Sequence, residues 1–289
     1  MWWTTAAGKL EQAKALDPAV QAATKVAGAV LPRGPVKDAL HGTWLGHQLH
    51  PMLIAGPIGL WSSALLLDLT AGKAGRPAAR RLVGAGVLAV LPTAASGLAD
   101  WSELGMAKGP KRVGLAHAAA NNVTALLFAA SWLARRRGRH ARGVGLALVG
   151  AGGLAVGGYL GGHLAYSQAV GMNRNANEPR KPRDWTDACA AAELTEGKPV
   201  QVEVAGNSLV LVRHQGEVSA MSALCSHWSG PLAEGDLVTS GDDSCLECPW
   251  HGSRFRLADG SVARGPATSP QLAYDVRTEG DRLQVRVRA

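Results

Sequence analysis

Four apolar segments, each close to the length of a membrane span, follow one another in the N-terminal part of the chain. They cover residues 51–70, 82–98 (extendable to Trp101), 113–133 and 144–166. The hydrocarbon core of a bilayer requires roughly 20 predominantly apolar residues per helix. Short basic loops separate these segments, as is typical between membrane spans. The pattern predicts a membrane all-α four-helix domain and disfavours a soluble Ala-rich bundle.

Small and aromatic residues add detail to this prediction. Gly153, Gly157 and Gly161 recur every four residues in the fourth segment, so one face should let a neighbouring helix approach closely. Several tryptophans at or towards segment ends suit an aromatic belt at the membrane surface. The tryptophans in these positions are Trp44, Trp61, Trp101 and Trp132.

Composition indicates a membrane part joined to a water-soluble part. Hydrophobic residues make up 47% of the 289 residues, yet aromatic residues make up only 5% and glycine occurs 36 times. The net charge of +8 raises the question of a nucleic-acid partner. However, the basic residues gather in short loops beside the apolar segments, where topology signals and lipid headgroups explain them better. We therefore expect membrane lipid as a partner and no nucleic acid.

The rest of the chain divides by composition. Residues 1–45 form an N-terminal segment with no signal peptide and a short amphipathic helix over 18–30, and 46–168 form the four-helix transmembrane domain. Residues 169–184 are polar, contain several prolines and are predicted to be a linker. Residues 185–289 show short alternating strands and glycine-containing turns, which predict a soluble antiparallel all-β domain. The strands are expected at 200–204, 208–212, 218–221, 272–276 and 283–287.

Two Cys/His pairs lie in this β region. Cys225-Ser-His227 and Cys248-Pro-Trp-His251 are separated by twenty residues. Two thiolates and two imidazoles in this arrangement can hold a 2Fe–2S cluster, with both cysteines on one iron and both histidines on the other. The alternative is structural zinc, which also takes two Cys and two His but usually as pairs of one type. Of the remaining cysteines, Cys245 is interpreted as a buried strand residue, and Cys189 has no motif around it.

The β region resembles a Rieske domain over residues 185–289. The resemblance rests on both ligand pairs and on Gly230-Pro231-Leu232 and Gly265-Pro266-Ala267. It implies the 2Fe–2S cluster, its four ligands and a hydrogen bond from Ser253 to a bridging sulfide. The disulfide cysteines of the bc-complex members are replaced here by Gly230 and Trp250, and their tyrosine donor is Phe255. The resemblance therefore implies a ferredoxin-type domain with a lower potential than the quinol-oxidising members.

The helical region resembles an uncharacterised bacterial family of four-helix membrane domains over residues 41–166. The matching stretches are 46–61 and 97–101, together with His117 and Asn121. This resemblance implies insertion into the membrane and supplies no activity.

Polar side chains within the spans gather near one membrane face when the helices are laid out in order. They are His47, His50, Asp100, His117, Asn121 and His163. Ionisable residues in spans are functional candidates, although hydrogen bonds between helices are an equal alternative here. His117 and Asn121 should share a helix face. We expect a candidate membrane redox site at His50, His117 and His163 that holds a haem or a quinone.

The sequence as a whole predicts a membrane-anchored, one-electron carrier, an oxidoreductase component rather than a self-contained catalyst. Its partners would be a donor and an acceptor protein or a quinone. Alternatives are a ferredoxin-like component of an oxygenase system and a non-redox zinc module. A complete ring-hydroxylating oxygenase is disfavoured, because no histidine follows His251 to bind a mononuclear iron. Basic residues are denser in the two loops opposite the β domain, which predicts a multi-pass cell-membrane protein with that domain outside the cytoplasm.

Overall fold

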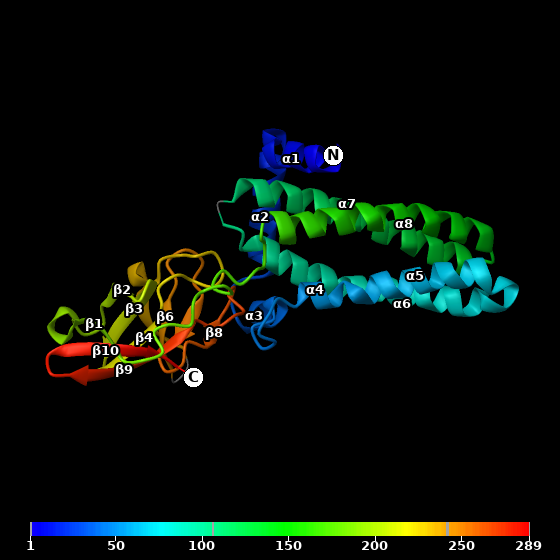
Figure 1. The fold of residues 1–289 in the computed structure, drawn as a ribbon. Helices are drawn as coiled ribbons and strands as arrows, with labels where there is room; N and C mark the ends of the chain where they lie inside the picture. Colours follow the sequence, from blue (N-terminus) through cyan, green and yellow to red (C-terminus); the bar gives the residue numbers. More distant parts are fainter. Residues whose placement is uncertain (1, 106, 241–242, 289) are drawn as a thin grey trace. The chain divides into compact units, whose positions relative to one another are not determined.

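The computed structural model describes residues 2–105, 107–240 and 243–288, and the chain folds into two compact units (Figure 1). The first unit comprises Met1–Pro32 and Leu49–Gly171, and the second comprises Arg33–Gln48 and Met172–Ala289. Helices build the first unit and strands dominate the second. This confirms the predicted fold class of a membrane all-α domain followed by an all-β domain.

The first unit contains the predicted membrane helices. Its helices are α1 (Trp2–Gln12), η1 (Lys14–Leu16), α2 (Asp17–Val30), α4 (His50–Leu53), α5 (Ala55–Thr70), α6 (Gly72–Ser102), α7 (Lys108–Arg136), α8 (His140–Gly162) and η2 (His163–Ser167). Four stretches are long and apolar enough to span a membrane: His50–Thr70, Gly72–Ser102, Lys108–Arg136 and His140–Ser167. Helix α6 begins at Gly72, before the predicted apolar segment at 82–98, because lysine and arginine continue a helix that they cannot bury in lipid.

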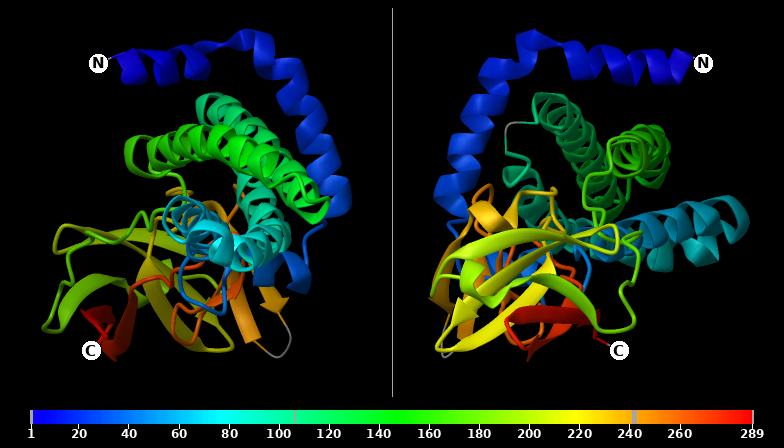
Figure 2. Two further views of the ribbon diagram at one scale, coloured as in Figure 1. Left: turned by 90° about the vertical axis from the view of Figure 1, so that its right-hand side faces the viewer. Right: turned by 60° about the vertical axis from the view of Figure 1, so that its left-hand side comes forward.

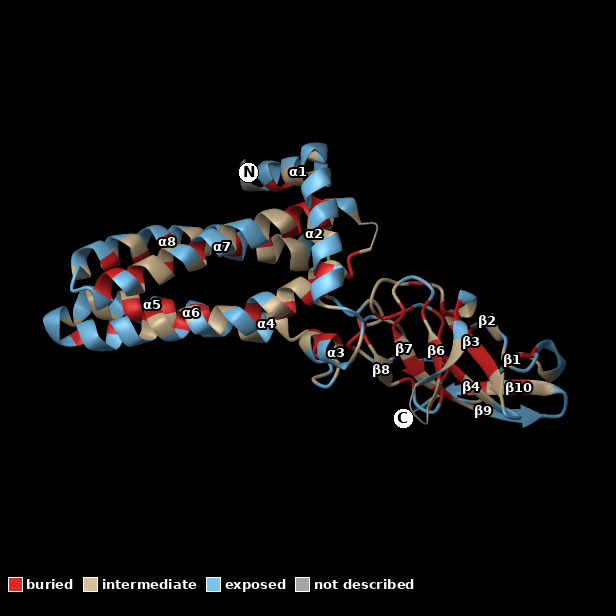
Figure 3. Ribbon diagram, turned by 180° about the vertical axis from the view of Figure 1, so that it is seen from behind, coloured by how far each residue is buried: buried red, intermediate tan, exposed pale blue. Residues whose placement is uncertain are grey.

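Large apolar side chains cover the outside of the membrane helices. Leu69 is 73% exposed and Leu126 is 70% exposed, whereas Val83 and Phe128 are fully buried. Exposed and buried positions follow one another along these helices (Figure 3). Such an apolar exterior suits helices whose surroundings are lipid. Trp61 departs from the expected aromatic belt, since it is buried and stacks on Phe128 with ring centroids 4.0 Å apart.

The glycine face of α8 packs against α7, and the two helices run side by side (Figure 2). A Cβ atom added at Gly153 would lie 2.1 Å from Oγ1 of Thr124. One added at Gly157 would lie 2.5 Å from Oδ1 of Asn121. The prediction that this face admits a neighbouring helix is therefore confirmed.

Ion pairs hold the N-terminal helices against the membrane helices. Arg112 of α7 donates to both carboxylate oxygens of Asp17, at 2.6 and 2.8 Å, and to the backbone oxygen of Glu11. No helix was predicted within residues 1–16, yet α1 forms there and lies against α7. Long-range charge pairing of this kind leaves no local pattern in a sequence.

The second unit contains two antiparallel sheets and helix α3 (Pro35–His41). One sheet has the order β1-β10-β9-β4-β3-β2, with bounds Thr186–Ala190, Arg282–Val287, Ala273–Glu279, Glu217–Ser222, Asn207–His214 and Pro199–Val204. The other has the order β5-β6-β7-β8, with bounds Asp236–Ser240, Asp243–Glu247, Arg254–Arg256 and Val262–Arg264. Short 3₁₀ turns η3 (Ala191–Glu193) and η4 (Leu232–Glu234) connect strands.

Local sequence explains how the strands are joined. Ala205-Gly206 and Gln215-Gly216 form two-residue hairpin loops on either side of β3, and all four residues have positive φ. This is the turn geometry whose twist matches the flanking strands. All five strands predicted from alternation are present, as β2, β3, β4, β9 and β10. The short strands β1 and β5–β8 were not predicted.

Strand β3 separates the two cores of the unit. Its alternate residues Leu209 and Leu211 pack into the core formed with Tyr274, whereas Val210 and Val212 face a second core. The second core contains Cys225, Cys248 and Phe255. Successive side chains of a strand point to opposite faces, so a strand buried on both faces ties the predicted metal site to the main sheet.

Candidate metal centre

Two loops carry the predicted ligands, and their backbones are built in the same way. In the first loop, Cys225 N donates to Gly230 O at 2.8 Å and Ser229 N donates to Cys225 O at 2.8 Å. In the second loop, Cys248 N donates to Ser253 O at 2.8 Å and Gly252 N donates to Cys248 O at 2.9 Å.

The same backbone position turns each of these loops. Ser229 and Gly252, each four residues after its cysteine, have positive φ values of 57° and 72°. Each loop therefore turns sharply back on its cysteine and presents the side chains between.

The two cysteine sulfurs lie together and accept backbone hydrogen bonds. The N–H groups of His227 and Trp228 donate to the sulfur of Cys225, and those of Trp250 and His251 donate to that of Cys248. The contact with Cys225 and these amides lower the pKa of Cys248 to about 7. The contact with Cys248 and burial raise the pKa of Cys225 well above its ordinary value. Amide donors at a buried thiolate stabilise the form that binds iron.

The two histidines meet at the same end of the unit. The ring centroids of His227 and His251 are 5.0 Å apart, and their planes are nearly perpendicular. Burial lowers the pKa of His227 well below its ordinary value, so its imidazole is neutral at physiological pH. Its Nδ1 atom is buried without a hydrogen-bond partner. A buried polar atom in this state requires an explanation, and an iron bound at Nδ1 supplies one.

The four side chains form two pairs rather than one four-ligand cluster. Across the described residues, no group of three or more His, Cys, Asp or Glu side chains is arranged to hold a single metal ion. A structural zinc ion collects four ligands around itself, whereas a 2Fe–2S centre of the mixed type takes one pair on each iron. The observed pairs, thiol with thiol and imidazole with imidazole, match the second arrangement.

Ser253 occupies a fully buried position directly after the second loop. Its Oγ accepts a hydrogen bond from Ala267 N at 2.9 Å. Because that contact uses an oxygen lone pair, the hydroxyl hydrogen remains able to donate to a sulfur. Phe255 is also fully buried, and it offers no such donor.

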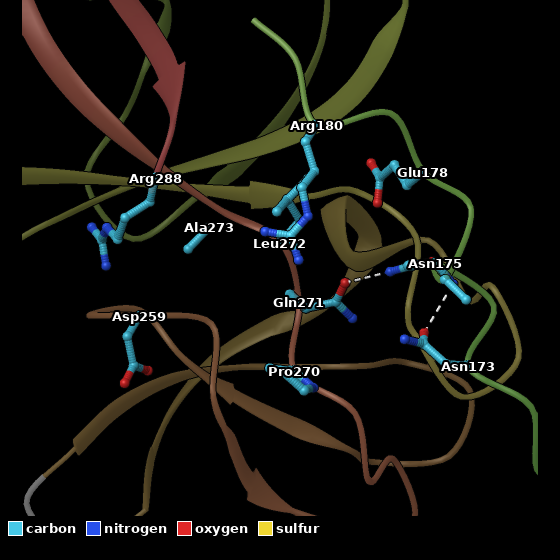
Figure 4. A pocket seen from close by; sticks show the side chains of 11 residues that line it. Asn173, Asn175, Glu178, Arg180, Asp259, Pro270, Gln271, Leu272, Ala273 and Arg288 are labelled. Carbon is cyan, nitrogen blue, oxygen red and sulfur yellow. Dashed lines mark hydrogen bonds between the residues drawn. The ribbon is translucent and has the colours of Figure 1, made fainter. Parts of the chain in front are cut away.

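The predicted linker does not hang free between the two domains but packs on the β unit. Arg174 N donates to Ser226 O at 2.9 Å, and its guanidinium lies 4.5 Å from the centroid of Trp228. Asn175 donates to Leu224 O at 2.8 Å. The same segment lines a pocket together with 270–273 (Figure 4). Composition alone did not reveal these contacts, because polar residues that bind backbone groups resemble solvated ones.

Helix α3 and its flanks also lie beside the second loop. Asp38 accepts a hydrogen bond from Gly265 N at 3.0 Å, and His41 is 2% exposed. A Cβ atom added at Gly265 would lie 3.2 Å from the His41 ring, and one added at Gly252 would lie 2.8 Å from Arg33. By composition these residues belong to a separate N-terminal segment, and no motif in them signals this contact.

The structure brings together two of the three histidines of the candidate membrane site. The rings of His50 and His117 have centroids 6.4 Å apart. His163 instead pairs with Glu11, with Nε2 2.6 Å from Oε1. Asn121 lies against His117 as expected, donating to its backbone oxygen at 2.9 Å. His47 is exposed and belongs to the second unit.

Comparison with known families agrees with this geometry. Residues 184–279 match the Rieske [2Fe-2S] domain family, and residues 46–174 match the family described as predicted membrane protein, DUF2231. The β unit therefore carries a Rieske-type 2Fe–2S domain, and the helical unit is a predicted multi-pass membrane domain. The two matches cover most of the chain.

Several of the relatives are ferredoxin components of dioxygenase systems. The ferredoxin component of the naphthalene 1,2-dioxygenase system of Pseudomonas aeruginosa is 34% identical over 101 residues, which are 35% of this chain and 93% of that protein. The anthranilate 1,2-dioxygenase ferredoxin subunit of Burkholderia cepacia is 33% identical over 36% of this chain and 93% of that protein. Among solved structures, the ferredoxin of carbazole 1,9a-dioxygenase from Nocardioides aromaticivorans is 30% identical, with a TM-score of 0.33, over 36% of this chain and 98% of that one.

Proposed function

The chain belongs to the Rieske [2Fe-2S] domain family, and from this premise we propose that it carries one electron between a donor in the membrane and a separate acceptor. When bound, a cluster of this type accepts and releases one electron. Cys225 and Cys248 would hold one iron, and His227 and His251 the other. The observation that supports this most strongly is the buried, unpartnered Nδ1 of His227, 5.0 Å from the His251 ring by centroids.

The chain's own groups would set how easily the centre is reduced. Backbone amides donate to each cysteine sulfur, and the hydroxyl of Ser253 can add a further donor. Donors to cluster sulfurs raise the potential, because they stabilise the more negative, reduced form. Phe255 lacks the hydroxyl group of the tyrosine that the quinol-oxidising members have at this position. We therefore propose a ferredoxin-type potential below that of the quinol-oxidising members.

A component of an oxygenase system is the second candidate function. The dioxygenase ferredoxins named above support it, since 93% of the naphthalene component is covered. The membrane helices favour a donor held in the membrane instead, such as a quinol or a haem. Reduction of the purified chain by quinol in vesicles, compared with reduction by a soluble reductase, separates these two functions.

The ligand assignment is tested by cysteine substitutions. Cys225→Ser or Cys248→Ser should abolish the electron paramagnetic resonance signal of reduced membranes, because a hydroxyl binds iron far more weakly than a thiolate does. Cys245→Ser is the matched control, since Cys245 is equally buried in β6. A signal that survives in the Cys225 variant and disappears in the Cys245 variant would overturn the assignment.

We also propose that the Rieske domain lies outside the cytoplasm. The support is the charge density of the loops between the spans, which is higher in the two loops opposite this domain. A reporter enzyme fused after residue 289 reads out the side in intact cells. A cytoplasmic readout contradicts the proposal.

The last part of the proposal places a redox cofactor, a haem or a quinone, in the membrane unit. Of the predicted residues His50, His117 and His163, the first two have rings that lie near each other and support it best. His163 is engaged by Glu11.

A further inference from the structure

The membrane unit is made of two similar helical hairpins that face each other through equivalent residues. His117, Phe128 and Arg135 of α7 each stand 67 positions after His50, Trp61 and Asp68 of α4 and α5. The two members of each pair lie close together. The ring centroids are 6.4 Å apart for His50–His117 and 4.0 Å for Trp61–Phe128, and Arg135 and Asp68 approach to 2.6 Å. Contacts between equivalent positions are the sign of a two-fold relationship.

The second helix of each hairpin repeats the same relationship. His50 Nδ1 lies 2.9 Å from Thr93 O on α6, and His117 Nδ1 lies 2.9 Å from Gly157 O on α8. Four residues after each of these carbonyls is a glycine, Gly97 or Gly161, against which the imidazole packs. An added Cβ would lie 2.8 Å from His50 Cε1 or 3.1 Å from His117 Cε1. Both hairpins thus seat a histidine in the same way.

These contacts determine which nitrogen of each ring carries the proton. A carbonyl oxygen can only accept a hydrogen bond, so Nδ1 is the protonated nitrogen in both rings. The lone pair then remains on Nε2, and a hydrogen-bonded Nδ1 is the arrangement that orients metal-binding histidines. The amide nitrogen of Asn121 is 3.3 Å from Nδ1 and 3.2 Å from Nε2 of His117. Such equal distances place it over the ring face rather than along the lone pair.

The separation of two imidazole rings limits the metal geometry that they could supply. With metal–nitrogen bonds of about 2.0 Å, two imidazoles on a tetrahedral metal have ring centres roughly 5 Å apart, and two on opposite sides of a metal roughly 6.3 Å apart. The His227–His251 pair, at 5.0 Å, fits the first value. The His50–His117 pair, at 6.4 Å, fits the second.

We propose that His50 and His117 are the two axial ligands of one haem iron, held between the two hairpins. This rests on the membrane redox site of the proposed function and assigns it a cofactor class and two residues. A porphyrin supplies the four remaining donors itself, and in the described part of the chain no third His, Cys, Asp or Glu joins this pair. Haem iron commonly takes axial histidine. Because each ring belongs to one hairpin, the two hairpins contribute equally to the site.

The test uses the full chain purified from membranes in detergent, with hemin as the probe. Wild type should bind one hemin per chain and give the optical and paramagnetic resonance spectra of low-spin, six-coordinate iron. His50→Ala and His117→Ala should each weaken hemin binding by roughly 10- to 100-fold or more. Any hemin still bound should be five-coordinate and, once reduced, should bind carbon monoxide, which wild type resists.

Two further variants separate ligation from folding. His50→Met offers another axial ligand, so it should keep six-coordinate iron with an altered spectrum. His140→Ala is the matched control in the same unit, since this histidine begins α8 beside Asp68, and its spectrum should equal that of wild type. Hemin binding that is unchanged in both alanine variants overturns the proposal, as does a wild type that binds quinone but no hemin. The cluster signal, recorded on the same samples, reports independently on the electron-carrier function.

Discussion

The carboxylate of Asp38 accepts a hydrogen bond from the backbone N–H of Gly265, 3.0 Å away and 227 positions later in the chain. Gly265 begins the stretch that ends at Ala267, whose N–H donates to Ser253 Oγ. The segment around α3 thus supports the loop that orients Ser253. It belongs to the Rieske unit, although four membrane helices separate the two in sequence.

Removing this carboxylate should destabilise the Rieske unit. Asp38→Ala leaves Gly265 N–H without its partner, and hydrogen bonds to charged groups contribute about 1.5–3 kcal/mol. Because the contact is only partly buried, we expect the lower end of that range. The measurement is the denaturant midpoint for loss of the cluster's visible absorbance. Asp38→Asn keeps an acceptor oxygen and is the control; equal midpoints for Asp38→Ala and wild type would show that α3 does not support the unit.

Removing one hydroxyl group near the cluster and adding another should shift the reduction potential of the cluster in opposite directions. Ser253→Ala removes a donor and should lower the potential, whereas Phe255→Tyr adds one and should raise it. A charge-assisted hydrogen bond of about 1.5–3 kcal/mol corresponds to roughly 60–130 mV for one electron. Redox titration followed by paramagnetic resonance measures the shifts.

The control for these potentials is Tyr274→Phe, which removes a buried hydroxyl from the other core. Its potential should stay at the wild-type value. Shifts of the same sign in the Ser253 and Phe255 variants would contradict a role as donors to the cluster.

Glu178 should make the Rieske unit less stable as the pH rises. Burial raises the pKa of this carboxyl above its ordinary value, while the hydrogen bond from Ser222 Oγ opposes the shift. A folded-state pKa above the unfolded one means that the native state binds the extra proton. Its contribution is therefore present below the unfolded pKa and is lost as the pH rises through the folded pKa.

The expected consequence is that Glu178→Gln gains stability over wild type at pH 7 and loses this advantage below about pH 4, under the ordinary glutamate pKa. Glutamine keeps the acceptor for Ser222. Denaturant unfolding between pH 4 and 7 gives the comparison, and an advantage that grows towards acid pH would refute it. Glu203→Gln, at an exposed position, serves as the control.

The buried ion pair of the membrane unit should be costly to break. Asp68 and Arg135 have side chains only 1% exposed and make two hydrogen bonds, at 2.8 and 2.6 Å. Arg135→Ala leaves the buried Asp68 carboxylate with only His140, whose Nε2 lies 3.5 Å away. We therefore expect the unit to lose about 3 kcal/mol, the lower end of the range for breaking a buried ion pair. Thermal unfolding in detergent is the readout.

Two variants control that experiment. The double variant Asp68→Leu/Arg135→Leu should recover most of the loss, because no unpaired charge remains. Arg137→Ala, at an exposed position, should change stability by less than about 0.5 kcal/mol. A double variant as unstable as the single one would show that the pair does more than neutralise charge.

Sequence alone determined the features that depend on neighbouring residues. The four spans follow from apolar length, and the strands β2, β3, β4, β9 and β10 follow from alternation. The two Cys/His pairs were visible because each pair lies in one tight loop, so its spacing is a local property. The glycine face of α8 was visible for the same reason.

Tertiary structure alone decided the features that depend on distant residues. It joined Asp38 to Gly265, packed the predicted linker on the β unit, and selected His117 rather than His163 to face His50. It also revealed the paired hairpins, whose equivalent positions share few residue types. Side chains as different as Trp61 and Phe128, or Asp68 and Arg135, occupy matching places because packing and charge require complementary partners there rather than identical ones.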